Sequence, residues 1–180
     1  KDFFMDKAKN IWIINDKDEL ILVDKNNMKA KTFLPYASST GNTTDQLYDL
    51  GVLEDQLYLF YRSGLLICYN LKSHQEIYRQ KLPDELPKGK YENTSYVVPG
   101  NNTFYQLRNG SQGGVMLNYD TTRKKWNIVF QTDYRLNSLS IDKDSSIWVS
   151  CYMGLWNIDA RLINKQYIPN LKLVDGRTIN

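Results

Sequence analysis

The sequence has 180 residues, with 42% hydrophobic and 24% charged side chains and a net charge of +3. This is the composition of an ordinary folded domain, and it excludes intrinsic disorder. No apolar run approaches the roughly 20 residues that cross a bilayer. The basic residues are scattered among acidic ones, with 123–125 the longest basic run, which argues against nucleic-acid binding.

Two residue types narrow the chemistry further. The single histidine, His74, lies in a polar stretch, so the chain cannot build a histidine metal cluster or a Ser-His-Asp triad. Cys68 and Cys151 both lie inside apolar stretches, and neither belongs to a Cys-x-x-Cys pair. We expect both to be buried free thiols, and we expect no metal and no cofactor.

Short apolar stretches bounded by Gly, Asn, Asp and Pro run through the whole chain, without the spacing of a long amphipathic helix. They predict β-strands in four units of four. In chain order the expected strands are 3–5, 11–13, 20–24 and 31–34; 48–52, 57–59, 65–70 and 76–79; 95–98, 103–105, 115–120 and 126–130; and 139–141, 147–149, 155–159 and 165–168. The units cover approximately 1–46, 47–93, 94–137 and 138–170, and 171–180 reads as the connection to a next unit.

One aromatic residue recurs in the second expected strand of each unit. Trp12, Tyr58, Tyr105 and Trp148 lie 46, 47 and 43 residues apart, and each is followed 11 to 15 residues later by an Asp or Asn that ends a strand. A repeat of roughly 40–50 residues with four strands is typical of a propeller blade. Because a blade cannot bury both faces alone, we expect these aromatics to be structural blade anchors. We expect the Asp and Asn residues to cap turns.

The predicted fold class is therefore all-β. It is a β-propeller arc of about four four-stranded blades, forming one domain over 1–180 that is itself part of a larger propeller. In such an arc the two terminal blades expose apolar faces that neighbouring blades would cover.

The fourth unit carries the most distinctive motif. Residues 142–159 read Asp-Lys-Asp-Ser-Ser-Ile-Trp-Val-Ser-Cys-Tyr-Met-Gly-Leu-Trp-Asn-Ile-Asp. This segment resembles the two-component regulator propeller repeat. It has a polar turn, then Ile-Trp-Val, then Gly-Leu and a strand that ends in Asp, although Ser stands where that repeat usually has Gly. The other units resemble it more loosely: the second keeps Gly64-Leu65 with Tyr58 in place of Trp, and the third is interrupted at 109–114.

Such repeats occur in the periplasmic sensor regions of hybrid two-component histidine kinases. The resemblance implies a periplasmic, non-catalytic sensor propeller in an inner-membrane-anchored protein, which detects oligosaccharides derived from glycans for signal transduction. It implies as partners an oligosaccharide or other small ligand and the remaining blades and ectodomain of the same protein, in a homodimer.

Propeller geometry indicates where a ligand would bind. Loops between the second and third strands of a blade share one rim with the connections between blades, and here they carry Tyr, Arg and Asn side chains. Aromatic rings stack on the apolar faces of a sugar, and Arg pairs with carboxylate or sulfate. The Gly-rich segment 110–114 suggests a flexible lid. The candidate ligand-binding residues are Arg62, Arg108, Asn109, Tyr134, Arg135 and Tyr152.

Two other functions stay open. A protein–protein interaction propeller would use the same rim and fits the residues equally well apart from the resemblance. A propeller glycosidase or lyase is the other, since 140–148 comes near the Asp-box Ser-x-Asp-x-Gly-x-Thr-Trp, but Asp144 replaces its Gly and Trp148 arrives one residue late. Two carboxylates at catalytic separation cannot be inferred from the sequence.

Overall fold

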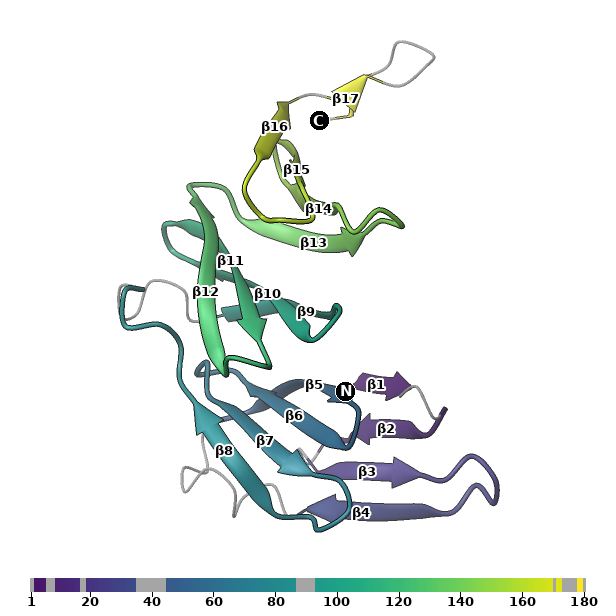
Figure 1. Cartoon of the computed structure of the whole chain (residues 1–180). Helices are drawn as coiled ribbons and strands as arrows, with labels where there is room; N and C mark the ends of the chain where they lie inside the picture. The colour runs from purple at the N-terminus through teal and green to yellow at the C-terminus, as the bar shows by residue number, and fades with distance from the viewer. Residues whose placement is uncertain are drawn as a thin grey trace. The chain divides into compact units, whose positions relative to one another are not determined.

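The computed structural model describes residues 2–5, 9–16, 19–34, 45–86, 93–169, 171–172 and 178–179 (Figure 1). Within these ranges every regular element is a β-strand, and neighbouring strands pair antiparallel to form four sheets of four strands. The same ranges contain no helix long and apolar enough to span a membrane. The predicted all-β class with propeller-like blades is confirmed. The chain divides into two compact units, Lys1–Lys81 and Leu82–Asn180.

The first unit contains two sheets, in each of which every strand pairs with the next one along the chain. Short strands separated by polar turns favour this up-and-down order, because a tight turn joins only adjacent antiparallel strands. The first sheet is β1 (Asp2–Met5), β2 (Ile11–Ile14), β3 (Leu20–Val23) and β4 (Ala30–Leu34), and the second is β5 (Leu47–Leu53), β6 (Gln56–Tyr61), β7 (Leu66–Asn70) and β8 (Glu76–Gln80).

The second unit repeats the arrangement with longer strands. A further pair, β17 (Leu171–Lys172) and β18 (Thr178–Ile179), follows its second sheet. Its larger sheets are β9 (Asn93–Pro99), β10 (Thr103–Gly110), β11 (Gly113–Asp120) and β12 (Lys125–Thr132), and then β13 (Leu136–Ile141), β14 (Ile147–Cys151), β15 (Gly154–Ile158) and β16 (Lys165–Pro169). Each expected unit of the sequence contains one sheet, and the organisation as a single domain stays a prediction.

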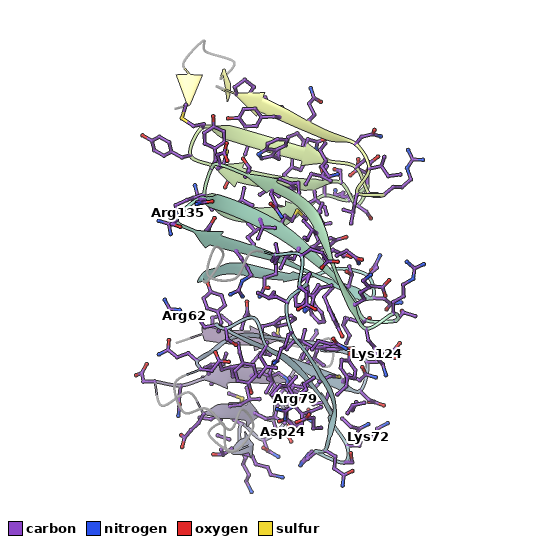
Figure 2. The ribbon with its side chains drawn as sticks, turned by 90° about the vertical axis from the view of Figure 1, so that its left-hand side faces the viewer. Asp24, Arg62, Lys72, Arg79, Lys124 and Arg135 are labelled. Carbon is purple, nitrogen blue, oxygen red and sulfur yellow. The ribbon has the colours of Figure 1, made fainter. Side chains whose placement is uncertain are left out.

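Each sheet has two ends that differ in the connections they hold. We call the connection rim the end that holds the turn between the second and third strands and the segments joining successive sheets. The turn rim is the opposite end. Within the first unit, Arg62 lies at the connection rim and Lys72 at the turn rim; within the second, Arg135 and Lys124 are separated in the same way (Figure 2).

Each unit has an apolar core between its two sheets. In the first unit Trp12, Ile14 and Leu20 of the first sheet pack with residues of β5, β6 and β7. In the second unit Leu107 and Met116 pack with residues of β13, β14 and β15. The face-to-face packing follows from strand alternation, which gives each sheet an apolar inner face.

The four aromatic anchors all lie in the second strand of their sheets, and their burial differs. Trp12 and Tyr58 are 1% and 2% exposed, whereas Tyr105 and Trp148 are half-buried. Trp12 belongs to the core of the first unit, and Tyr105 packs against the core of the second. Trp148 alternates with the buried Val149 and so lies on the other face of β14.

The Asp and Asn residues that end the third strands cap the turns that follow them, as predicted. Asn70 Oδ1 accepts hydrogen bonds from the backbone N–H groups of Lys72 and Ser73, both at 2.8 Å. Asp24, Asp120 and Asp159 accept equivalent bonds in the other sheets. A side-chain acceptor for otherwise unpaired turn N–H groups stabilises the turn, which explains why these residues recur. Cys68 and Cys151 are buried and free, as expected.

Candidate functional site

The connection rim of the second unit presents a group of exposed tyrosines. Tyr134 follows β12 and is 40% exposed, and Tyr152, in the turn between β14 and β15, is 77% exposed. Met153 beside it is 44% exposed. The aromatic rings that the structure describes in the neighbouring strands are buried or half-buried. Rings that face water at a rim are available for stacking against a ligand.

Tyr167 of β16 ties these two segments together. Its ring stacks on that of Tyr134, with 6.1 Å between the ring centroids and 14° between the planes. Its hydroxyl donates a 2.8 Å hydrogen bond to the Met153 carbonyl. Desolvation raises the pKa of the Tyr167 hydroxyl, with further contributions from Cys151 and Tyr134.

Behind Tyr167 the aromatic contacts continue into the core. The rings of Tyr167 and Trp156 lie 4.9 Å apart, and those of Trp156 and Phe130 lie 5.0 Å apart, counted between centroids. Tilted ring pairs at such distances are each worth about 0.5–1.5 kcal/mol beyond the area they bury. The exposed Tyr134 ring is therefore the outer end of a packed series, which holds it in one orientation.

Arg135 stands next to Tyr134 and is exposed at the same rim (Figure 2). Its guanidinium offers a fixed fork of donors, which pairs bidentately with a carboxylate or sulfate. The structure thus brings three of the predicted residues, Tyr134, Arg135 and Tyr152, to one rim of one unit.

Arg62 lies in the first unit, in the turn between β6 and β7. The turn is held against the segment that enters β5: Arg62 N donates to the Gln46 carbonyl at 2.8 Å, and Arg62 Nη1 donates to Gln46 Oε1 at 3.2 Å. Ser63 contacts the Asp45 carboxylate through both its N–H and its hydroxyl, at 2.9 and 2.5 Å. Arg62 is exposed at the connection rim, as the prediction placed it.

The expected loop position of Arg108 and Asn109 is wrong. Both residues lie inside β10 and are buried, Arg108 to 0% and Asn109 to 4% exposure. The Gly-rich segment does not form a lid, because β10 and β11 continue as one long hairpin through Asn109–Gly114 and Gly110–Gly113 pairs. A Cβ on Gly113 would lie 2.0 Å from the Thr132 carbonyl oxygen, so this glycine allows close strand approach.

Asn109 has a structural task in this position. Its Nδ2 donates to the Leu136 carbonyl at 2.7 Å, and its Oδ1 accepts from the Leu136 N–H at 2.8 Å. The amide thereby fastens β10 to the start of β13. A role of Arg108 or Asn109 in ligand binding is untested, and their burial gives them no place at the exposed rim.

Two features of the second unit could not be predicted from the sequence. Tyr167 was not singled out, because it lies in an ordinary fourth strand and only its stacking on Tyr134 reveals its importance. A polar hollow at the turn rim of the third sheet, between residues 101–103 and 118–123, was also missed. It depends on which turns lie side by side, and no local motif encodes that.

No protein-family model matches the chain, and no curated protein matches it in sequence. Solved structures do match. The extracellular domain of the putative hybrid two-component system BT4673 from B. thetaiotaomicron has a TM-score of 0.64 and 19% identity, over 94% of this chain and 21% of that one. The extracellular domain of the putative hybrid two-component system BT3049 from the same organism has a TM-score of 0.64 and 12% identity, over 96% of this chain and 22% of that one. Saccharomyces cerevisiae Sqt1 has a TM-score of 0.66 and 12% identity, over 87% of this chain and 44% of that one.

These likenesses define the class of fold, a run of propeller blades. The chain spans about a fifth of the length of the two sensor domains that it matches. The suspected likeness to the propeller sensor region of hybrid two-component systems is therefore found in the structure as well as in the repeat motif.

Proposed function

We propose that this chain is a ligand-sensing propeller segment in the extracytoplasmic, periplasmic region of a hybrid two-component sensor histidine kinase. Its ligand is an oligosaccharide derived from a glycan, bound at the connection rim of the second unit. The segment is non-catalytic, and the remaining blades and the ectodomain of the same protein, as a homodimer, are its partners.

The observation that carries the proposal is the pairing of this fold with the exposed rim. Over more than nine-tenths of its length the chain matches extracellular domains of two hybrid two-component systems. On that fold, Tyr134, Arg135 and Tyr152 are all exposed at one rim of the second unit. Rings for the apolar faces of a sugar and an Arg fork for an acidic substituent are the groups that oligosaccharide recognition needs.

The carboxylates of the near Asp-box make hydrogen bonds within their own turn, and Asp144 does not fit the role of a general acid. Asp144 accepts a 2.9 Å hydrogen bond from the Ser146 N–H, and hydrogen bonds from the Ser146 side chain and backbone lower the pKa of its carboxyl. Asp142 accepts a 2.6 Å bond from the Lys143 N–H. A glycosidase general acid needs a raised pKa, and Asp144 is shifted in the other direction.

Signalling follows from a shift of populations. An oligosaccharide that binds one arrangement of the dimeric ectodomain more tightly than another favours that arrangement, by an amount set by the difference in affinity. Tyr134 is held by the ring series behind it, so the rim is preorganised and binding costs little ordering of side chains.

A thermal-shift screen of the chain against neutral, carboxylated and sulfated oligosaccharides tests the proposal. A ligand that binds only the folded state raises Tm with its concentration. We expect one glycan class to raise Tm, and we expect Tyr152→Ala to abolish the rise without changing the Tm of the free protein. A Tm rise that survives in Tyr134→Ala and Tyr152→Ala alike would show that the ligand binds elsewhere.

A protein-interaction propeller is the second candidate function. The observation in its favour is that the same fold matches Sqt1 and a chain of the mitotic checkpoint complex at TM-scores of 0.66 and 0.65. This alternative predicts no glycan-dependent shift in a chain that melts cooperatively, together with association of a protein partner that Tyr152→Ala weakens.

A further inference from the structure

The turn rim of the third sheet holds a second site of different character. Here the turn between β9 and β10 meets the turn between β11 and β12, and together they line an open hollow of about 430 Å³. This volume lies within the range of small-ligand pockets, about 300–1,000 Å³. The lining residues are Asn101, Asn102, Thr103, Asn118, Asp120, Thr122 and Arg123.

Hydrogen bonds between the two turns hold the walls of this turn-rim hollow. The Asn102 carbonyl accepts from the Thr121 N–H at 3.1 Å and from the Thr121 hydroxyl at 2.8 Å. Thr103 Oγ1 donates to the Tyr119 carbonyl at 2.8 Å and accepts from the Asn118 amide. The two turns that line the hollow are therefore fixed to each other.

The second sheet has a corner with a similar backbone bond and an ion pair across it. The Asp55 carbonyl there accepts from the Leu71 N–H at 2.9 Å, the bond that corresponds to the one between Asn102 and Thr121. Lys72 Nζ then reaches Asp55 Oδ2 at 2.5 Å and spans the corner with an ion pair. The third sheet keeps the backbone bond but has the short Thr122 at the position that corresponds to Lys72, and its corner forms the hollow.

The charges of the hollow are balanced internally. Asp120 Oδ1 accepts from the N–H groups of Thr122 and Arg123, both at 2.9 Å, and its Oδ2 lies 3.8 Å from Arg123 Nε. A cation would have to compete with these donors for the carboxylate, and an anion would meet an Arg that already faces a carboxylate. A neutral ligand meets neither obstacle.

The remaining polar groups suit hydroxyls. The side-chain amides of Asn101 and Asn102 are exposed on adjacent residues, and Thr122 adds a hydroxyl. An amide offers a donor and an acceptor side by side, and a pair of neighbouring sugar hydroxyls offers the complementary pattern. The backbone of Asn102 has φ 51°, a left-handed conformation that Asn adopts more readily than most residues.

We propose that the turn-rim hollow binds a neutral sugar ring through the Asn101 and Asn102 amides and the Thr122 hydroxyl. This is a second carbohydrate subsite at the opposite end of its sheet from the connection rim. This subsite does not rest on the proposed function, because none of its residues belongs to the connection rim.

The second sheet supplies the test variant. Asn102→Asp/Thr122→Lys places a carboxylate and a long ammonium side chain at the lining positions that correspond to Asp55 and Lys72, which removes the Asn102 amide and the Thr122 hydroxyl from the hollow. The probes are methyl α-glucoside, methyl β-galactoside, methyl α-mannoside, N-acetylglucosamine, maltose and lactose. Binding is measured by saturation-transfer NMR and calorimetry on the full chain.

We expect at least one neutral probe to bind with Kd below about 10 mM, and the double variant to weaken it at least about tenfold. Asn101→Ala, which leaves the turn backbone in place, should weaken the same probe. Ile163→Ala, in the turn between β15 and β16, should leave its Kd unchanged, as should Lys72→Ala. Absence of binding by all six probes, or a Kd that the double variant leaves unchanged, would overturn the subsite.

Discussion

The side-chain amide of Asn109 pairs with the backbone of Leu136 through both its nitrogen and its oxygen, at 2.7 and 2.8 Å. It makes the two bonds that a residue of a neighbouring strand would make, and it joins the two sheets of the second unit where β13 begins. Both partners are buried, so water cannot replace the amide.

Asn109→Ala should therefore strongly destabilise the protein. It leaves the Leu136 N–H and carbonyl without a partner, and each buried unsatisfied group costs about 1–3 kcal/mol, so we expect a loss of about 3 kcal/mol in the free energy of unfolding. Denaturant titration measures it, with Asn137→Ala at an exposed position as control. A loss below about 0.5 kcal/mol would mean that the amide is not a clamp.

Tyr167→Phe tests what the Tyr167 hydroxyl contributes at the connection rim of the second unit, apart from the packing of its ring. The change keeps the stack on Tyr134 and removes the hydrogen bond to the Met153 carbonyl. We expect the adjacent Tyr152 turn to become more mobile and the rim ligand to bind several-fold more weakly. Hydrogen exchange of the 152–154 amides measures the first effect and calorimetry the second. Unchanged exchange would show that the hydroxyl does not hold this turn.

Among the residues that the structure describes, eight that are not glycine have a left-handed backbone, two in the turns of each sheet. Met28 is one of them, with φ 56°, and its side chain is 68% exposed. Because glycine adopts this conformation without the Cβ clash, Met28→Gly should raise the free energy of unfolding by about 1 kcal/mol. Met28→Ala, which removes the side chain and keeps the Cβ, is the control. Equal stability of the two variants would contradict the strain argument.

Asp144 should make stability depend on pH. Hydrogen bonds from Ser146 lower the pKa of its carboxyl in the folded protein. A lowered folded-state pKa contributes stability that is present above the unfolded-state pKa and is lost as pH falls through the folded-state pKa. We expect Asp144→Asn to flatten the fall of Tm below about pH 4, near the usual Asp pKa. Parallel Tm curves for the variant and the original protein down to pH 2 would contradict this.

The strand pattern of the chain could be predicted because it is local. Alternating apolar residues and turn-forming Asp, Asn and Gly define each strand, and the caps at Asn70 and Asp120 arise from residues one turn apart. The positions of Tyr134, Arg135 and Tyr152 at one rim follow from the up-and-down order alone.

The errors arise where pairing between strands decides the structure. The glycines at 110–114 read as a loop, yet Gly113 and Gly114 lie in β11, and the strand passes so close to Thr132 and Leu136 that a side chain would clash. Arg108 was placed in that loop for the same reason. Tyr167 and the turn-rim hollow were missed because their importance depends on neighbours distant in sequence.

The most direct test of the central claim is calorimetry of the chain and of its Tyr134→Ala/Tyr152→Ala variant with the oligosaccharide class that raises Tm in the screen. Ile163→Ala removes an apolar side chain of comparable exposure, 66%, at the turn rim of the same unit and serves as control. The account predicts binding by the original protein and the control, and at least about a tenfold loss in the double variant. Equal affinity in all three proteins, or no oligosaccharide that binds a cooperatively folded chain, would contradict it.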